Sequence, residues 1–151
     1  INCAIEDGVD IINISIGFEE GSEVLKSAID NAEKNDIIVV SASGNDGTTK
    51  KYYPASYDNV VKVTAINKSV IVTNFSTYDN GVDFAAPGYE IQTTTLGGNY
   101  IKTRGTSVAA PFVTAVAAII LSYRETTNPE EILEIMINTC LEVSNIVTTY
   151  Q

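Results

Sequence analysis

The chain has 151 residues, of which 44% are hydrophobic and 19% are charged, a composition typical of one globular domain. Its 9 basic and 19 acidic residues give a formal net charge of −10, so we expect it to bind neither nucleic acid nor an anionic membrane. Cys3 and Cys140 are too few for a disulfide framework, and a zinc site is not expected in a chain without histidine. We expect both thiols to be buried.

The first third of the chain predicts a strand, a helix and a second strand. Residues 1–5 resemble the end of a helix and carry no signal segment, so we expect a cut N-terminus. Residues 9–14 are rich in β-branched side chains and apolar on both faces, which is typical of a strand in a covered parallel sheet. Ser22 can cap a helix, and residues 36–42 predict the next strand. The segment therefore predicts a βαβ unit with a right-handed crossover.

Two polar segments follow these strands. Ligands of open α/β sheets gather beyond the carboxyl ends of the strands, and residues 15–17 and 43–45 occupy those ends. Taken alone, residues 43–47 are equally typical of a turn, because Asn, Asp and Gly are common in loops.

The middle of the chain predicts further extended segments. Residues 60–66 form another predicted strand, and residues 82–88 form a short extended piece. Residues 90–95 and 99–103, separated by a glycine-containing turn, predict a hairpin.

Two helices are predicted in the last third. Residues 107–122 are apolar nearly all round, which predicts a central helix, and this stretch is too short to span a membrane. Asn128 followed by Pro129 and two glutamates predicts the start of a last, peripheral helix that ends near residue 138. The elements together predict an α/β fold of three layers, with a mostly parallel sheet flanked by helices.

The predicted hairpin leads into residues 105–111, GTSVAAP, where the apolar helix begins. Ser107 could present its hydroxyl to a cleft while its N–H joins the unpaired donors of the helix N-terminus, which is the geometry of a nucleophile. From these residues alone, a helix cap is the simpler interpretation.

Four stretches, in this order, resemble the subtilisin-like serine proteases of bacterial type. They are residues 13–17 (NISIG), 41–47 (SASGNDG), 83–88 (DFAAPG) and 105–111 (GTSVAAP). The likeness follows the order of elements along nearly the whole chain. It implies a subtilisin-like fold in which residues 1–151 form part of one peptidase domain that is incomplete at its N-terminal side.

The resemblance also implies roles for particular residues. Ser107 corresponds to the nucleophile and Asn45 to the side-chain donor of the oxyanion hole. The segments that line the primary specificity pocket and pair with the substrate backbone correspond to Ser15, Ile16, Gly17, Ala42, Ser43 and Gly44. A tetrahedral oxyanion needs preorganised donors, and the Asn45 amide and the Ser107 N–H would supply two.

The base that such a serine needs is missing. In this family a histidine oriented by an aspartate activates the serine, and the landmarks of both lie upstream of the stretch that corresponds to residues 13–17. The chain contains no histidine. Lys102 is the lysine nearest to Ser107 in sequence, but a solvated hairpin lysine is its simpler interpretation. We therefore expect the chain alone to be inactive.

The resemblance carries expectations about partners, cofactors and location. The substrate would be a peptide or protein, no cofactor would be required, and the location would be secreted or at the cell surface. The carbonyls of Ala55, Tyr57 and Val60 could hold a weak structural calcium or monovalent cation. Without the missing N-terminal half, strand 9–14 would expose an apolar edge, so we expect self-association, strand exchange or a complementary chain.

Two other functions remain open on the sequence. A non-catalytic subtilase-like module could bind a peptide or a partner through the substrate groove, and it would share every motif named above. An unrelated nucleotide-binding protein could use residues 44–47 or 97–98 as a phosphate loop, but neither stretch precedes a predicted helix as phosphate loops do.

Overall fold

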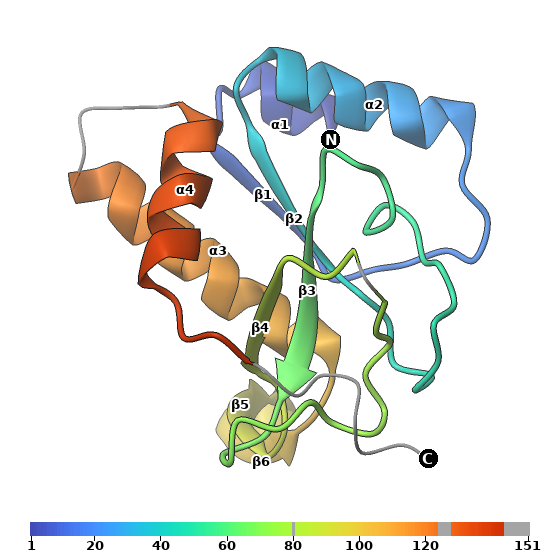
Figure 1. Cartoon of the computed structure of the whole chain (residues 1–151), viewed down its shortest axis with the longest axis vertical. Coiled ribbons are helices and arrows are strands. Elements are labelled where there is room, and N and C mark those ends of the chain that lie inside the picture. The colour runs from blue at the N-terminus through green and yellow to red at the C-terminus, as the bar shows by residue number, and fades with distance from the viewer. Residues whose placement is uncertain (80, 124–127, 144–151) are drawn as a thin grey trace.

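The computed structural model describes residues 1–79, 81–123 and 128–143. Its helices are α1 (Asn2–Glu6), α2 (Glu23–Lys34), α3 (Thr106–Tyr123) and α4 (Pro129–Thr139), and its strands are β1 (Ile11–Ile14), β2 (Ile38–Ala42), β3 (Val61–Ile66), β4 (Phe84–Pro87), β5 (Ile91–Thr95) and β6 (Asn99–Thr103). Strands β1 to β4 form a parallel sheet in the order β1-β2-β3-β4 (Figure 1). The predicted α/β fold with a mostly parallel sheet is confirmed.

Helices cover both faces of this sheet and make three layers. Successive residues leading into and along β2 point to opposite faces, as the period of a strand requires. Ile37 and Val39 pack in the core cluster that contains α2, whereas Ile38 and Val40 pack in the cluster that contains α3. All five residues of β2 are buried, which explains why apolar side chains fall on both faces of its sequence.

Helix α2 begins where the sequence predicts. The Ser22 hydroxyl accepts a hydrogen bond from the Leu25 N–H at 3.2 Å, so Ser22 is the N-cap. Ile29 and Ala32 are fully buried against the sheet, and they belong to the apolar stripe of the helix. The predicted βαβ unit is therefore present as β1, α2 and β2.

Helix α3 lies across the sheet and contacts all four of its strands. Its N-terminal half buries Ala109, Ala110 and Val113, whose small side chains allow close approach to the strands. Its outer side is exposed, with Ile119 63% accessible, although the helix is central as predicted. The expectation that this stretch is too short to span a membrane is corrected, because α3 has 18 residues and is long and apolar enough to cross one by length and composition, a property that core helices of soluble proteins share.

Helix α4 packs on α3 and begins at the predicted place. The Asn128 side chain accepts a hydrogen bond from the Glu130 N–H at 2.9 Å and caps the helix. Although the helix is peripheral, Ile132 and Met136 are buried in the core cluster of α3.

Both cysteines are exposed, which corrects the expectation of buried thiols. Cys3 lies on α1, no residue of which is buried, and Cys140 is the C-cap of α4. Each thiol therefore lies at a position that does not contribute to the buried core.

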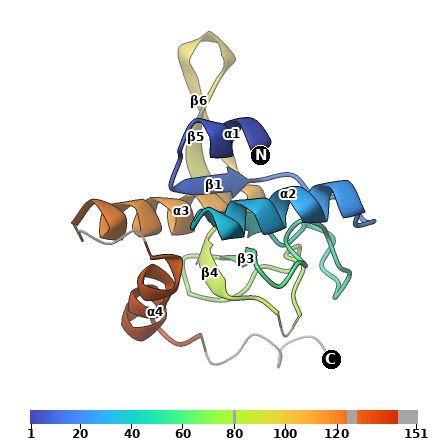
Figure 2. The same ribbon diagram turned by 90° about the horizontal axis from the view of Figure 1, so that it is seen from above.

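Strands β5 and β6 form the predicted hairpin. They pair antiparallel and extend away from the rest of the molecule (Figure 2). The chain leaves β6 at Thr103, turns at Gly105 and enters α3, so the hairpin leads directly to Ser107.

Candidate active site

The segment after β1 meets the first turn of α3. The Ser15 hydroxyl donates a hydrogen bond of 2.9 Å to the Ser107 carbonyl across 92 residues of sequence. Asn13 Nδ2 donates to Ser15 Oγ at 3.1 Å, and Asn13 Oδ1 accepts from Thr114 of α3 at 3.0 Å. Ser107 is thus tied to β1 by a short chain of polar side chains.

The segment after β2 meets the same turn through Asn45. Asn45 Oδ1 accepts the Thr106 N–H at 2.8 Å, and Thr106 Oγ1 lies 3.1 Å from the same oxygen. Because a backbone N–H can only donate, this contact fixes which end of the amide is oxygen. Nδ2 therefore points away from Thr106, and it donates to no acceptor among the described residues.

Two hydrogen-bond donors lie close together beside Gly105. A Cβ placed on Gly105 would lie 3.6 Å from Asn45 Nδ2 and 3.7 Å from the Ser107 nitrogen. The φ of Gly105 is +149°, a backbone conformation that residues with a side chain rarely adopt. Glycine therefore keeps the space between the two donors open.

The hydroxyl of Ser107 is available for chemistry. Ser107 is the second residue of α3 and is half-buried, and within residues 1–79, 81–123 and 128–143 its Oγ has no hydrogen-bond partner. Its N–H is one of the donors that a helix start leaves unpaired. A hydroxyl beside two unused donors is suited to acyl transfer, because the donors can stabilise the charge on a tetrahedral oxyanion.

The six residues expected to line the pocket differ in burial and in the direction of their side chains. Ala42 is buried in β2, and the Ser43 hydroxyl turns inward to the Thr77 carbonyl at 2.8 Å. Ile16 is exposed. Gly17 and Gly44 face each other across a third residue, Tyr52. A Cβ on Gly17 would lie 3.3 Å from Tyr52 Cβ, and one on Gly44 would lie 2.6 Å from Tyr52 Cδ2.

Tyr52 and its partner Asp46 lie beside the residues expected to line the pocket, and sequence reasoning gave neither a role. Tyr52 Oη donates to Asp46 Oδ2 at 3.1 Å, and Asp46 Oδ1 accepts from Thr77 Oγ1 at 2.6 Å and from the Thr48 N–H at 3.2 Å. Burial acts to raise the pKa of Asp46, but hydrogen bonds from Thr77, Thr48 and Tyr52 outweigh it and lower the pKa. The charged form of Asp46 therefore anchors this loop. The only signal for Tyr52 in the sequence is the pair Gly17 and Gly44, whose lack of side chains allows a neighbour to pack closely against them.

A lysine ammonium lies beside the turn that carries Ala55, Tyr57 and Val60. The Tyr57 carbonyl accepts the Val60 N–H at 3.2 Å, so it already has one partner. The ammonium of the buried residue Lys62 lies 3.5 Å from Ser56 Oγ and 2.6 Å from Asp79. The ammonium contacts these two side chains and none of the three carbonyls, so a weak cation held by the carbonyls of Ala55, Tyr57 and Val60 stays a prediction.

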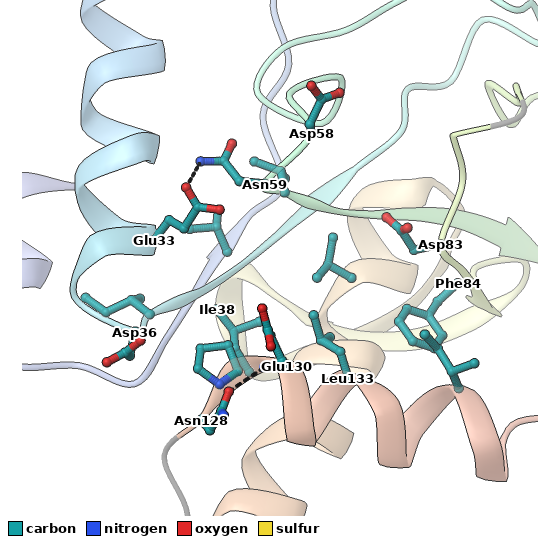
Figure 3. Close-up of a pocket in the computed structure, with 16 residues that line it drawn as sticks. Glu33, Asp36, Ile38, Asp58, Asn59, Asp83, Phe84, Asn128, Glu130 and Leu133 are labelled. Atoms are coloured by element: carbon teal, nitrogen blue, oxygen red, sulfur yellow. Dashed lines mark hydrogen bonds between the residues drawn. The ribbon is translucent and has the colours of Figure 1, made fainter.

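A cavity of about 830 Å³ lies at the opposite end of the sheet (Figure 3). It is lined by the residues that begin β2, β3 and β4, and by α4. Its acidic residues are Glu33, Asp36, Asp58, Asp83 and Glu130. None of the residues expected in the active site lines it, because they follow the carboxyl ends of the strands.

A parallel α/β sheet that brings a helix-start serine beside an amide donor defines a serine hydrolase type of site. The chain belongs to the subtilase family, whose model matches residues 1–150. This membership removes the nucleotide-binding alternative.

Named relatives and solved structures agree with this membership. The chain is 37% identical to Subtilisin E of Bacillus subtilis (strain 168) over 149 residues, which cover 96% of the chain and 39% of that relative. It is 40% identical to the Major intracellular serine protease of the same strain over 130 residues, covering 83% of the chain and 41% of that relative. The structure of the Patellamide maturation protease PatA is similar with a TM-score of 0.86 and 30% identity, covering 93% of the chain and 56% of that structure. The chain thus spans less than two thirds of the length of these proteins.

Proposed function

We propose that the chain is the carboxyl-side part of a subtilisin-type serine endopeptidase, with Ser107 as nucleophile. One observation carries this proposal most directly. Asn45 Oδ1 is held by the Thr106 N–H at 2.8 Å, so that Nδ2 remains unused in the described structure beside the Ser107 nitrogen. That pair of donors is what a tetrahedral oxyanion requires.

In this mechanism Ser107 Oγ attacks the carbonyl carbon of the scissile peptide bond. The hydroxyl proton passes to a base, and the carbonyl oxygen becomes an oxyanion that accepts from Asn45 Nδ2 and the Ser107 N–H. Collapse of the intermediate breaks the C–N bond, and the base returns the proton to the leaving amine. Water then hydrolyses the acyl-serine by the same route in reverse.

The base in this proposal comes from outside the 151 residues. The chain has no histidine, and Lys102 lies on the exposed strand β6 of the hairpin. We infer that an aspartate and a histidine are supplied by a further segment that completes the peptidase domain. The reaction as proposed requires no cofactor.

A fluorophosphonate probe tests the nucleophile, because it labels only an activated serine. In the longer protein that supplies the aspartate and histidine, we expect labelling at Ser107 and none in Ser107→Ala. The 151-residue chain alone should remain unlabelled, because a serine without its base loses most of the triad's contribution. Absence of labelling in the folded longer protein, or labelling of the chain alone, would contradict the proposal.

The absence of histidine also favours a second candidate, a non-catalytic module that binds peptides or a partner through the same groove. The gene sequence upstream of Ile1 discriminates between the two. If it encodes the aspartate and histidine landmarks of the family, the second candidate fails. If other residues replace them, the enzyme proposal fails.

Secretion or surface display is the location we propose, from the habit of the family. One of the relatives named above is called an intracellular protease, so identity of this degree is compatible with another location. An immunoblot of culture medium, surface fraction and cell lysate tests the proposal. Recovery of the protein in the lysate alone would contradict it.

A further inference from the structure

The ring of Tyr52 fills the space between the segments that follow β1 and β2. On one side, a Cβ on Gly17 would lie 3.6 Å from Tyr52 Cδ1. On the other side, a Cβ on Gly44 would lie 2.9 Å from Tyr52 Cε2, closer than Cβ atoms approach other atoms in proteins. The two edges of one ring therefore face one glycine each, and the ring spans the gap between the two segments.

Several contacts hold the ring in this place. Its hydroxyl donates to Asp46 Oδ2 at 3.1 Å, and Asp46 is itself fixed by Thr77 and Thr48. The next residue, Tyr53, exchanges two backbone hydrogen bonds of 2.8 Å with Phe18. The loop that carries Tyr52 is thus joined to the segment after β1 on one side and to the segment after β2 on the other.

A charged pair closes the outer side of the same loop. Lys50 Nζ lies 2.6 Å from Glu19 Oε1 and 5.9 Å from the centre of the Tyr52 ring. Glu19 follows Phe18 in the segment after β1, so this ion pair crosses the same gap as the ring. A side chain entering between the two segments would have to displace both a fixed aromatic ring and this bridge.

We propose that Tyr52 closes the primary specificity pocket, so that the enzyme cleaves after small residues such as alanine and excludes aromatic ones. This inference rests on the proposed function, because it takes residues 15–17 and 42–44 as the walls of that pocket. A methyl group needs little of the space that the ring occupies, whereas a phenyl group needs all of it, and forcing both into one pocket is unfavourable.

The test compares two peptide substrates that differ only in alanine or phenylalanine on the acyl side of the scissile bond. In the longer, complete protease, we expect kcat/KM for the alanine peptide to exceed that for the phenylalanine peptide by about tenfold or more. Tyr52→Ala removes the ring and should reverse this preference, mainly by raising kcat/KM for the phenylalanine peptide. Tyr52→Leu, which refills part of the pocket, should lie between the two.

Two further variants serve as controls. Tyr52→Phe keeps the ring but loses the hydrogen bond to Asp46, so the preference should stay on the side of alanine. Tyr123→Ala removes a tyrosine that is 91% exposed at the end of α3 and should leave the ratio unchanged. Labelling of Ser107 by fluorophosphonate, measured in each variant, reports an intact fold and active centre independently of the pocket.

Three outcomes are distinguishable. Labelled enzymes whose preference reverses in Tyr52→Ala support the inference. Labelled enzymes that cleave both peptides equally, prefer phenylalanine in the wild type or keep their ratio in Tyr52→Ala overturn it and leave the proposed function standing. Failure of the folded wild-type protease to react with the probe or to cleave either peptide overturns the proposed function and this inference together.

Discussion

At the scale of single residues, the orientation of the Asn45 amide decides what the site can do. Its oxygen is used by Thr106, and its nitrogen is the donor that we propose for the oxyanion. The same amide turned by 180° would oppose a donor to the Thr106 N–H and present an acceptor to the substrate oxygen. Thr106, which is buried, therefore acts as a positioning residue for the proposed donor.

Replacement of Asn45 by alanine should slow the complete protease in the chemical step. We expect kcat to fall by about 10²–10³, the loss known for removal of such a donor in a subtilisin, with little change in KM. Kinetics on one peptide substrate would measure this. Thr114→Ser, which keeps the hydroxyl near Asn13, is the control. A loss below tenfold would contradict the role of Asn45.

A second residue-scale feature is the ion pair between Lys62 and Asp79, at 2.6 Å, in which the lysine is almost fully buried. Burial acts to raise the pKa of Asp79, but the hydrogen bonds from Lys62 and the Gly81 N–H, together with the positive charges of Lys62 and Lys51, outweigh it, and the pKa lies below its ordinary value of 3.8. Because the pKa of Asp79 is lower in the folded state than in the unfolded state, the ion pair stabilises the fold at pH values above the ordinary pKa of 3.8. The contribution is lost as the pH falls through the folded-state pKa.

Asp79→Asn should therefore lower the free energy of unfolding at pH 7 by about 3 kcal/mol, because it leaves a buried ammonium without its carboxylate. The difference from the wild type should shrink as the pH falls below 3.8. Urea unfolding across this range measures both effects. Asp10→Asn, at an exposed carboxylate, should change little at any pH. A difference that does not vary with pH would contradict the assignment.

At the scale of elements, the ends of the helices follow from local chemistry that the sequence shows. Ser22 and Asn128 both accept the backbone hydrogen bond expected of an N-cap. Strands β1 to β3 were recognisable because β-branched residues run along them. Their pairing partners depend on contacts between distant segments, which a local pattern does not contain.

Ser22→Ala should destabilise α2 by removing the acceptor for the Leu25 N–H. The expected loss in free energy of unfolding is about 1 kcal/mol. Ser27→Ala, at an exposed position inside the same helix, is the matched control and should be neutral or slightly stabilising. Equal effects of the two substitutions in thermal unfolding would show that capping is not the cause.

Two features of the structure could not be predicted from the sequence because both depend on packing between distant segments. An apolar helix such as α3 carries no polar face to reveal which side is exposed, so the sequence does not show that its outer residues face solvent. Tyr52 lies in a loop without periodicity, and only the three-dimensional approach of Gly17 and Gly44 shows its place. Ser107 and Asn45 could be predicted as site residues because the family resemblance covers their motifs. The residues that fill the pocket could not be predicted, because they depend on packing between distant segments.

At the scale of the whole molecule, β1 is an edge of the main sheet. In the described part of the chain it pairs only with β2, so one side of its backbone is available for another strand. We expect the 151-residue chain to self-associate through this edge, or to bind the segment that completes the domain. Sedimentation velocity over a series of concentrations measures this. A monomer at every concentration, with β1 open to solvent, would contradict the expectation.

The hydrogen bond between Ser15 and Ser107 joins residues that are 92 positions apart. A ribosome adds about 5–20 residues per second, so Ser107 is made roughly 5–20 s after Ser15. The hairpin and the first turn of α3 are also made after every strand of the main sheet. A nascent chain therefore holds an oxyanion donor and pocket walls well before it holds a nucleophile. The proposed proteolytic activity is thus withheld during synthesis by the order of residues along the chain.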